Sequence, residues 1–310
     1  MTTTLSLQEQ VKIIKSMIVK ILNQESHKDH YLTKMPSSDV LLVAILAITE
    51  YGQNYRLSLE RCKENGFCDY VIHESQFSRR IGRLENFINP IISDLERFSE
   101  REIKASPDLN LFQDSYITDT MPIKICENIR IPRVRITKFK DDYGVTDKET
   151  IEAFRGFIAS KRQYFYGVKL SLICNCLGFP KEFELYPGET FDPQCLSFMN
   201  LDLRENTELY CDKIYDLDYL EENLKYTENI NLKPIRKKTT KKDKSLTAIT
   251  EISLFRKLIE TMFSLYTATL PKKIHAVTLT GFLRKVRYSM LGFSFTQFFR
   301  LGLQKYLLTS

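Results

Sequence analysis

The 310-residue sequence contains no apolar run that approaches the roughly 18–20 residues needed to span a bilayer. The longest such stretch, residues 40–48, is about half that length and is typical of a buried helix. The first residues also lack the charged-then-apolar pattern of a secretory signal. From the sequence we therefore expect a cytoplasmic protein that does not enter a membrane.

Several common catalytic and binding motifs are missing as well. The eleven glycines never occur two residues apart, and no Gly-Lys-Ser/Thr triplet exists, which argues against a nucleotide phosphate loop. There is no Gly-x-Ser-x-Gly elbow, and four histidines leave little material for a histidine-based triad. The seven cysteines include no Cys-x-x-Cys pair, so we expect reduced thiols rather than a zinc or redox site.

Acidic residues are absent from residues 261–310, which carry seven basic residues. Residues 232–244 add seven basic residues against one acid. Residues 1–100, by contrast, are nearly balanced, with 12 basic and 13 acidic residues. This clustering favours a polyanionic partner, most simply nucleic acid, although a solvated lysine-rich loop explains residues 236–244 equally well.

The first part of the chain, residues 5–105, has the periodicity of amphipathic and buried helices. Within it, residues 73–98 carry apolar side chains on one face of a helix and Arg79, Arg80 and Arg83 on another. A short helix with an arginine face fits the recognition element of a DNA-binding helix-turn-helix. A surface helix with ordinary arginines fits the same pattern.

From about residue 106 the pattern changes to strands that alternate with helices. Antiparallel hairpins followed by alternating strands and helices predict an α/β fold, a mixed sheet with helices on its faces. We therefore expect two domains, an all-α domain at residues 1–105 and an α/β domain at residues 106–310. The strands are expected at 115–125, 163–175, 181–188, 207–212 and 229–237, and the helices at 216–226, 249–267 and 281–308.

Three carboxylates occupy unusual places in this pattern. Asp119 lies inside a strand, where Asp is disfavoured, and Asp212 ends a strand. Glu260 lies at the rim of the apolar stripe of a long helix, with Arg256 one turn earlier. Taken singly, Asp119 could cap a turn, Asp212 could cap the next helix and Glu260 could pair with Arg256.

Taken together, the three acids have another interpretation. If the strands of Asp119 and Asp212 are neighbours and the helix of Glu260 crosses them, the carboxylates converge at one end of the sheet. Such a cluster cannot stay ionised unaided, because like charges raise each other's pKa. Mg²⁺ prefers oxygen ligands, and two such ions would activate an attacking oxygen and stabilise a leaving one in phosphoryl transfer.

The chain resembles the DDE transposases of bacterial insertion sequences, most closely the insertion sequence 982 family. Asp119, Asp212 and Glu260 fall in the blocks that hold the three acids of that family. The spacing of Arg256, Glu260 and Phe263 is the most diagnostic short piece. The resembling segments are ITDTMPIKICENIRI (117–131), FRGFIASKRQYFYGVKL (154–170), EFELYPGETFD (182–192), LYCDKIYD (209–216), PIRKK (234–238), FRKLIETMFSLY (255–266) and LPKKIHAVTLTGFLRKV (270–286).

The resemblance implies a ribonuclease-H-like catalytic domain with a five-stranded mixed sheet, two Mg²⁺ or Mn²⁺ ions, and a bacterial, nucleoid-associated location. It implies cleavage of double-stranded DNA at element ends and transfer to target DNA, and a homo-oligomer is plausible because two ends must meet. Ser253, Thr267 and Ile214 depart from the family pattern. An inactive DNA-binding relic and a ribonuclease-H-like nuclease therefore stay as alternatives.

DNA contacts are expected from basic residues near the acids and on the N-terminal helices, since phosphate binding needs positive charge but little geometry. Arg256 is expected to contact a phosphate rather than only to neutralise Glu260. The other expected contacts are Lys213, Arg155, Arg236, Lys237, Lys238, Lys241, Lys242, Arg79, Arg80 and Arg83.

Overall fold

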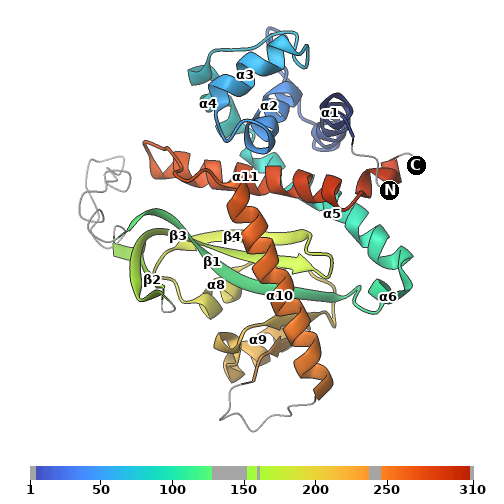
Figure 1. Cartoon of the computed structure of the whole chain (residues 1–310), viewed down its shortest axis with the longest axis vertical. Helices are drawn as coiled ribbons and strands as arrows, with labels where there is room; N and C mark the ends of the chain where they lie inside the picture. The colour runs from blue at the N-terminus through green and yellow to red at the C-terminus, as the bar shows by residue number, and fades with distance from the viewer. Residues whose placement is uncertain (1–4, 128–151, 159–160, 237–245, 308–310) are drawn as a thin grey trace. The chain divides into compact units, whose positions relative to one another are not determined.

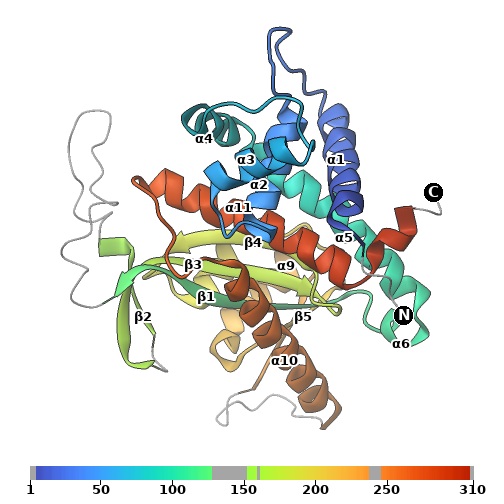
Figure 2. The same cartoon turned by 45° about the horizontal axis from the view of Figure 1, so that its top comes forward.

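The computed structural model describes residues 5–127, 152–158, 161–236 and 246–307 (Figures 1 and 2). It divides into two compact units, which we describe separately. Unit 1 holds the described residues of Met1–Glu102, Tyr266–Ile274 and Thr280–Ser310, and unit 2 holds those of Ile103–Leu265 and His275–Leu279.

The described part of unit 1 is helical. At its centre is α2, which is apolar almost all round and is buried from Ser37 to Ile48, as expected of a core helix. A capping box between Ser6 and Glu9 starts α1. The helices are α1 (Leu7–Gln24), α2 (Ser37–Thr49), α3 (Tyr55–Glu64), α4 (Glu74–Arg83), α5 (Ile88–Ala105) and α11 (Leu279–Arg300), with 3-10 turns η1 (Glu85–Phe87) and η5 (Leu303–Leu307).

The C-terminal helix α11 packs with the N-terminal helices. The Tyr288 hydroxyl donates a hydrogen bond of 2.8 Å to the Ile81 carbonyl, and the rings of Phe98 and Phe298 meet edge to face. This grouping differs from the sequence prediction, which placed all of residues 106–310 in one domain. The reason is that α11 is apolar on most sides and completes the core of unit 1.

The connection between α3 and α4 covers residues 65–73. A tight helix-turn-helix joins its helices through three or four residues, so this connection is longer than that motif uses. Helix α4 nevertheless carries the arginine face that the sequence predicts, with Phe77 and Ile81 buried on the opposite side.

Unit 2 is a mixed α/β structure. The strands at 115–125, 163–175 and 181–188 were predicted within two residues of their ends. The short strand β2 and helix α8 were not predicted. The elements are α6 (Pro107–Asn110), β1 (Ser115–Glu127), β2 (Arg155–Ile158), β3 (Gln163–Asn175), β4 (Pro180–Pro187), α8 (Asp192–Phe198), β5 (Glu208–Cys211), the 3-10 turn η4 (Lys213–Tyr215), α9 (Asp218–Glu228), β6 (Asn231–Pro234) and α10 (Leu246–Thr269), the last four residues of which fall in unit 1.

The described sheet has six strands in five lateral positions. Its path is β2-β3-β1-β5-β6, and β4 pairs with the same edge of β3 as β2, further along the strand. Strands β1, β3 and β4 are antiparallel neighbours, whereas β5 runs parallel to both β1 and β6. The mixed sheet predicted from the sequence is therefore confirmed, with β2 as an additional strand.

Helices cover both faces of this sheet. Residues of α8 and α9 pack with Tyr116, Ile173 and Cys211 in one buried cluster on the first face. Helix α10 runs across the opposite face (Figures 1 and 2), where the Phe255 ring stacks on the Tyr210 ring. In the described part of the chain, no helix combines the length and apolar character needed to cross a membrane.

Candidate active site

Strands β1 and β5 bring Asp119 and Asp212 to the same face of the sheet. The two strands are parallel, and their last pair is Ile117 with Tyr210. Asp119 and Asp212 each come two residues after a member of that pair, so the alternation of side chains turns both toward the face that α10 covers. Each carboxylate accepts a 2.8 Å hydrogen bond from the next residue's backbone N–H.

Helix α10 brings Glu260 to this face. Phe255, Ile259 and Met262 are buried and fix the helix against the sheet. The Phe255 ring lies 4.3 Å from the Tyr210 ring and stacks on it. Glu260 is left at the rim, where its side chain is 62% exposed, as the sequence periodicity predicts.

Arg256 lies between two of the acids. Its Nε donates a hydrogen bond of 3.1 Å to Oε1 of Glu260, and its Nη1 lies 3.8 Å from Oδ1 of Asp212. The hydrogen bond that Arg256 donates to Glu260 and the charge of Asp212 raise the pKa of Arg256. Arg256 therefore neutralises acids in this structure, while its half-exposed guanidinium stays open to solvent on one side.

Asp119 is the acid most perturbed by its surroundings. Its pKa is raised to about 7, mainly by burial and also by the charges of Asp192 and Asp212, although the hydrogen bond from the Thr120 N–H and the charge of Arg256 lower it. Burial disfavours the charged form of this carboxyl, and a positive charge close to it would favour that form. Strongly perturbed pKa values of this kind cluster at functional sites.

The three acids line one small cavity of about 40 Å³, together with Thr118, Cys211 and Arg256 among others. That volume is close to the space that one water molecule or a bare ion occupies. The three acids that the sequence expected to lie together therefore line one cavity of the structure.

The donor set of this cavity suits a hard divalent cation, because carboxylate oxygens are the ligands that Mg²⁺ and Mn²⁺ prefer. Among the described residues, no group of three or more His, Cys, Asp or Glu side chains lies close enough to hold a metal ion. In the structure the Glu260 carboxylate accepts a hydrogen bond from Arg256 instead. Asp119, Asp212 and Glu260 are the carboxylates that line the cavity and could serve as ligands of such a cation.

A family model described as "Transposase DDE domain" matches residues 111–270, just over half of the chain. The match begins before β1 and ends after α10, so it contains Asp119, Asp212 and Glu260. The chain belongs to the DDE transposase family. No curated protein and no solved structure matches it.

The sequence did not single out Asp192, which acts electrostatically on the transposase site. Asp192 begins α8, and Oδ1 of its carboxylate lies 2.7 Å from Nζ of Lys169. Lys169 also donates a hydrogen bond of 2.7 Å to the Thr190 carbonyl. Although paired with Lys169, Asp192 contributes to the raised pKa of Asp119. Its only signal in the sequence was an Asp-Pro pair, which is typical of a helix start.

Two of the predicted DNA contacts of the transposase domain are exposed. Lys213 follows Asp212 directly and is exposed to solvent. The guanidinium carbon of Arg155 lies 4.8 Å from the centre of the Tyr164 ring, and the side chain is 48% exposed. Arg155 also forms an exposed ion pair with Glu152 at 3.8 Å, so a phosphate group would compete with that acid for the guanidinium.

Arg236, which is also a predicted DNA contact, is paired with acids in the structure. Its guanidinium pairs with Asp216 at 2.9 Å and with Glu221, and the side chain is only 20% exposed. Arg236 therefore holds the end of β6 to η4 and α9, and its charge is already matched. The remaining predicted contacts of this basic run, Lys237, Lys238, Lys241 and Lys242, lie outside the described residues.

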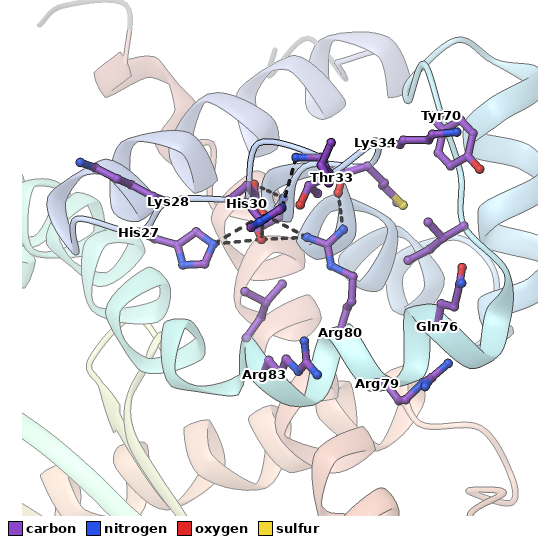
Figure 3. Close-up of a pocket in the computed structure, with 16 residues that line it drawn as sticks. His27, Lys28, His30, Thr33, Lys34, Tyr70, Gln76, Arg79, Arg80 and Arg83 are labelled. Carbon is purple, nitrogen blue, oxygen red and sulfur yellow. Dashed lines mark hydrogen bonds and ion pairs between the residues drawn. The ribbon is translucent and has the colours of Figure 1, made fainter.

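Unit 1 of the transposase contains a pocket of about 650 Å³ between α4 and the segment 27–37 (Figure 3). Its lining includes Lys28, Lys34, Arg79 and Arg83, all exposed, and the Nζ of Lys34 lies 5.4 Å from the centre of the Tyr70 ring. These charges exceed the single acid in the lining, so the pocket is positively charged.

Arg80 has a different role from its two neighbours on α4. It points toward the segment 27–37 (Figure 3) and donates hydrogen bonds to the Met35 carbonyl, to Asp29 at 3.1 Å and to Ser37 at 3.1 Å. Burial alone would raise the pKa of Asp29, but hydrogen bonds from Ser37 and the charge of Arg80 hold it below its usual range. In this structure Arg80 is bonded to the wall of the pocket, and its contact with DNA stays a prediction.

Proposed function

We propose that this chain is the transposase of a bacterial insertion sequence, similar to those of the insertion sequence 982 family. It would cleave DNA at the element ends and join the freed 3′-hydroxyl to target DNA. The observation that carries the proposal is that Asp119, Asp212, Glu260 and Arg256 line one cavity inside the matched domain. The strand order supports a ribonuclease-H-like fold, since three antiparallel neighbours are followed by two strands parallel to the first.

In the proposed mechanism, Asp119 and Asp212 hold divalent cations from the sheet, and Glu260 completes the site from α10. Two bound cations would supply Lewis acidity at the attacking and leaving oxygens of the phosphoryl transfer. Water is the nucleophile for cleavage, and the freed 3′-hydroxyl is the nucleophile for joining. No covalent bond between enzyme and DNA is needed.

Arg256 has two roles in this proposal. Before DNA and metal arrive, it neutralises Glu260 and Asp212 and so limits like-charge repulsion. With DNA bound, its guanidinium would leave the two acids and contact a phosphate of the bound strand, since Arg binds phosphate with two parallel hydrogen bonds. Lys213 and Arg155 would add contacts to the DNA backbone.

The positive pocket of unit 1 is proposed to bind the backbone of the element end. Arg79, Arg83, Lys28 and Lys34 would contact phosphates, while Arg80 keeps the wall formed by the segment 27–37 in place. Two ends must be joined in one reaction, so we also propose that the transposase works as a homo-oligomer on the bacterial chromosome.

The test is an assay of end cleavage and strand joining. A labelled fragment with the flanks of the gene is incubated with a supercoiled plasmid, in Mg²⁺, in Mn²⁺ and in EDTA. We expect a nick at a defined end and a joined product, both dependent on the cation. A 3′-dideoxy end should be unable to join.

Asp119→Asn and Glu260→Ala should each lower cleavage by roughly a thousandfold, because metal ligands contribute several kcal/mol to transition-state stabilisation. Salt-sensitive binding of the fragment without cleavage by the wild-type protein would identify an inactive relic instead. Cleavage without any preference for element ends would favour a ribonuclease-H-like nuclease.

A further inference from the structure

The hairpin formed by β2 and β3 has an unusual surface for the edge of a sheet. Residues 155–166 contain three basic residues, Arg155, Lys161 and Arg162, and no acid. All three are exposed. A hairpin with this excess of positive charge attracts a polyanion such as nucleic acid.

Two large aromatic side chains on this hairpin also face solvent. Phe157 and Tyr164 are opposite each other in the β2–β3 register, and each is 49% exposed. Their rings lie 4.8 Å apart with an angle of 49°, and Arg155 lies over the Tyr164 ring at 4.8 Å. The two rings and the guanidinium form one continuous exposed patch, which we call the aromatic patch.

The base of the hairpin is built from glycines that let backbones touch. A Cβ at Gly156 would lie 2.3 Å from the Gly188 carbonyl oxygen, and one at Gly167 would lie 2.1 Å from the Ile123 carbonyl oxygen. The Gly167 N–H donates a hydrogen bond of 2.9 Å to the Phe154 carbonyl. These contacts pack β2 against the residue that follows β4 and pack β3 against β1, and the β2–β3 ladder joins the two strands of the hairpin. The strands that carry the aromatic patch are therefore fixed to the rest of the sheet.

The aromatic patch lies on the same sheet face as the three acids. Side chains alternate along β3, so Tyr164 shares a face with Leu172, which is paired with Asp119. The two positions are eight residues apart along the strand, or about 26 Å in an extended chain. DNA bound at the acids and following this face would therefore meet the aromatic patch within roughly eight base pairs.

We infer that the aromatic patch stacks an unpaired base of the DNA substrate, with Arg155 on the adjoining phosphate. Every base has a flat face that stacks on an aromatic ring, whereas a paired duplex hides those faces. The surrounding basic residues supply the charge that a nucleic acid needs and a protein partner with apolar side chains does not. This inference rests on the proposed function, because the unpaired base belongs to the DNA that the transposase is proposed to cleave.

The experiment compares binding of two DNA fragments in EDTA, where no cleavage can occur. One is a full duplex with the element end, and the other has two unpaired bases at that end, one of them 2-aminopurine. We expect the wild-type protein to bind the opened fragment about five- to a hundredfold more tightly and to quench the fluorescence of the 2-aminopurine.

Tyr164→Ala should remove most of that preference, and Tyr164→Phe should retain it, because stacking needs the ring and not the hydroxyl. Tyr226→Ala is the matched control, since Tyr226 is a 93% exposed tyrosine on α9 away from the hairpin. Thermal melting checks that each variant is folded.

Equal binding of both fragments by the wild-type protein, or a preference that survives Tyr164→Ala, would overturn the inference while leaving the proposed function intact. A protein that binds neither fragment would instead contradict the proposed function.

Discussion

The Nε of Arg256 lies 3.1 Å from Oε1 of Glu260, one helical turn further along α10. The Glu260 carboxylate can accept this hydrogen bond or bind a divalent cation, and the two compete for the same oxygens. In the structure the carboxylate is bonded to Arg256. Cation binding is therefore expected to separate Glu260 from Arg256.

Arg256→Ala should have opposite effects on metal binding and on DNA cleavage. Without the competing guanidinium, Mn²⁺ should bind the DNA-free protein more tightly, by up to about fivefold, since an exposed ion pair contributes at most ~1 kcal/mol. Cleavage should nevertheless fall, because the proposed phosphate contact is lost. Calorimetric titration of Mn²⁺ and the end-cleavage assay measure the two effects. Arg61→Ala, which breaks a comparable exposed pair with Glu64 on α3, should change neither.

Cation binding should strengthen as pH rises through 7. Asp119 has a folded-state pKa of about 7, above its unfolded value of 3.8, so protons compete with a cation below that pH. By linkage, the stability that protonated Asp119 contributes is present below the unfolded pKa and is lost as pH rises through the folded one.

The metal-free protein should therefore lose this contribution between about pH 4 and pH 7, and Mg²⁺ should raise the Tm more at pH 8 than at pH 6. Melting curves at several pH values with and without Mg²⁺ measure this. Asp119→Asn should show no pH-dependent difference between the two sets of curves. An equal Mg²⁺ effect at pH 6 and pH 8 in the wild-type protein would contradict the assignment.

The arginines of α4 should fall into two classes. Arg79→Ala combined with Arg83→Ala should weaken DNA binding and reduce its salt dependence by about two counterions, because each proposed phosphate contact releases roughly one. The melting temperature should hardly change, since both side chains are exposed. Electrophoretic mobility shifts at several salt concentrations give the slope, and Arg56→Ala combined with Arg61→Ala on α3 is the matched control.

Arg80→Ala should instead lower stability. It removes the hydrogen bonds to Met35, Asp29 and Ser37, so the Met35 carbonyl loses this donor and only the bonds between Asp29 and Ser37 remain in that part of the wall. We expect a loss of about 1–3 kcal/mol in the free energy of unfolding, measured by urea denaturation. A stable Arg80→Ala variant with weakened DNA binding would support the prediction that Arg80 contacts DNA.

Gly178→Ala should disturb the site through α10. Gly178 has a φ of +72° in the turn between β3 and β4, and a Cβ there would lie 2.6 Å from the Met262 sulfur. The added methyl strains the turn by about 1 kcal/mol or more and presses on the helix that carries Glu260. We expect a lower Tm and weaker cleavage. Met262→Ala in the same chain should relieve part of the steric contact, but not the backbone strain.

The sequence predicted the features that local pattern controls. The hairpin signal after residues 163–175 predicted a strand with the correct ends, and the period of α10 placed Glu260 and Arg256 at the rim of its apolar stripe. It missed the edge strand β2, although the equally short β5 and β6 were predicted, and it missed the seven-residue helix α8. Short edge elements are defined by their neighbours rather than by their own composition.

Ion pairs between distant residues could not be predicted either. Arg236 meets Asp216 and Glu221, and Arg80 meets Asp29, only after the chain has folded. A basic residue in a sequence therefore indicates charge, but not whether that charge is already matched. The same applies to Asp192, whose electrostatic effect on Asp119 depends on where α8 packs.

The most direct test of the account is the metal preference of an Asp119→Cys variant in the end-cleavage assay. Thiolates bind Mn²⁺ and Cd²⁺ better than Mg²⁺, so replacing a carboxylate ligand by a thiolate changes which metal supports the reaction. We predict that Asp119→Cys is inactive in Mg²⁺ and recovers cleavage in Mn²⁺ or Cd²⁺, whereas the wild-type protein cleaves in Mg²⁺. Cleavage by Asp119→Cys in Mg²⁺ at the wild-type rate would mean that Asp119 holds no metal and that the central claim is wrong.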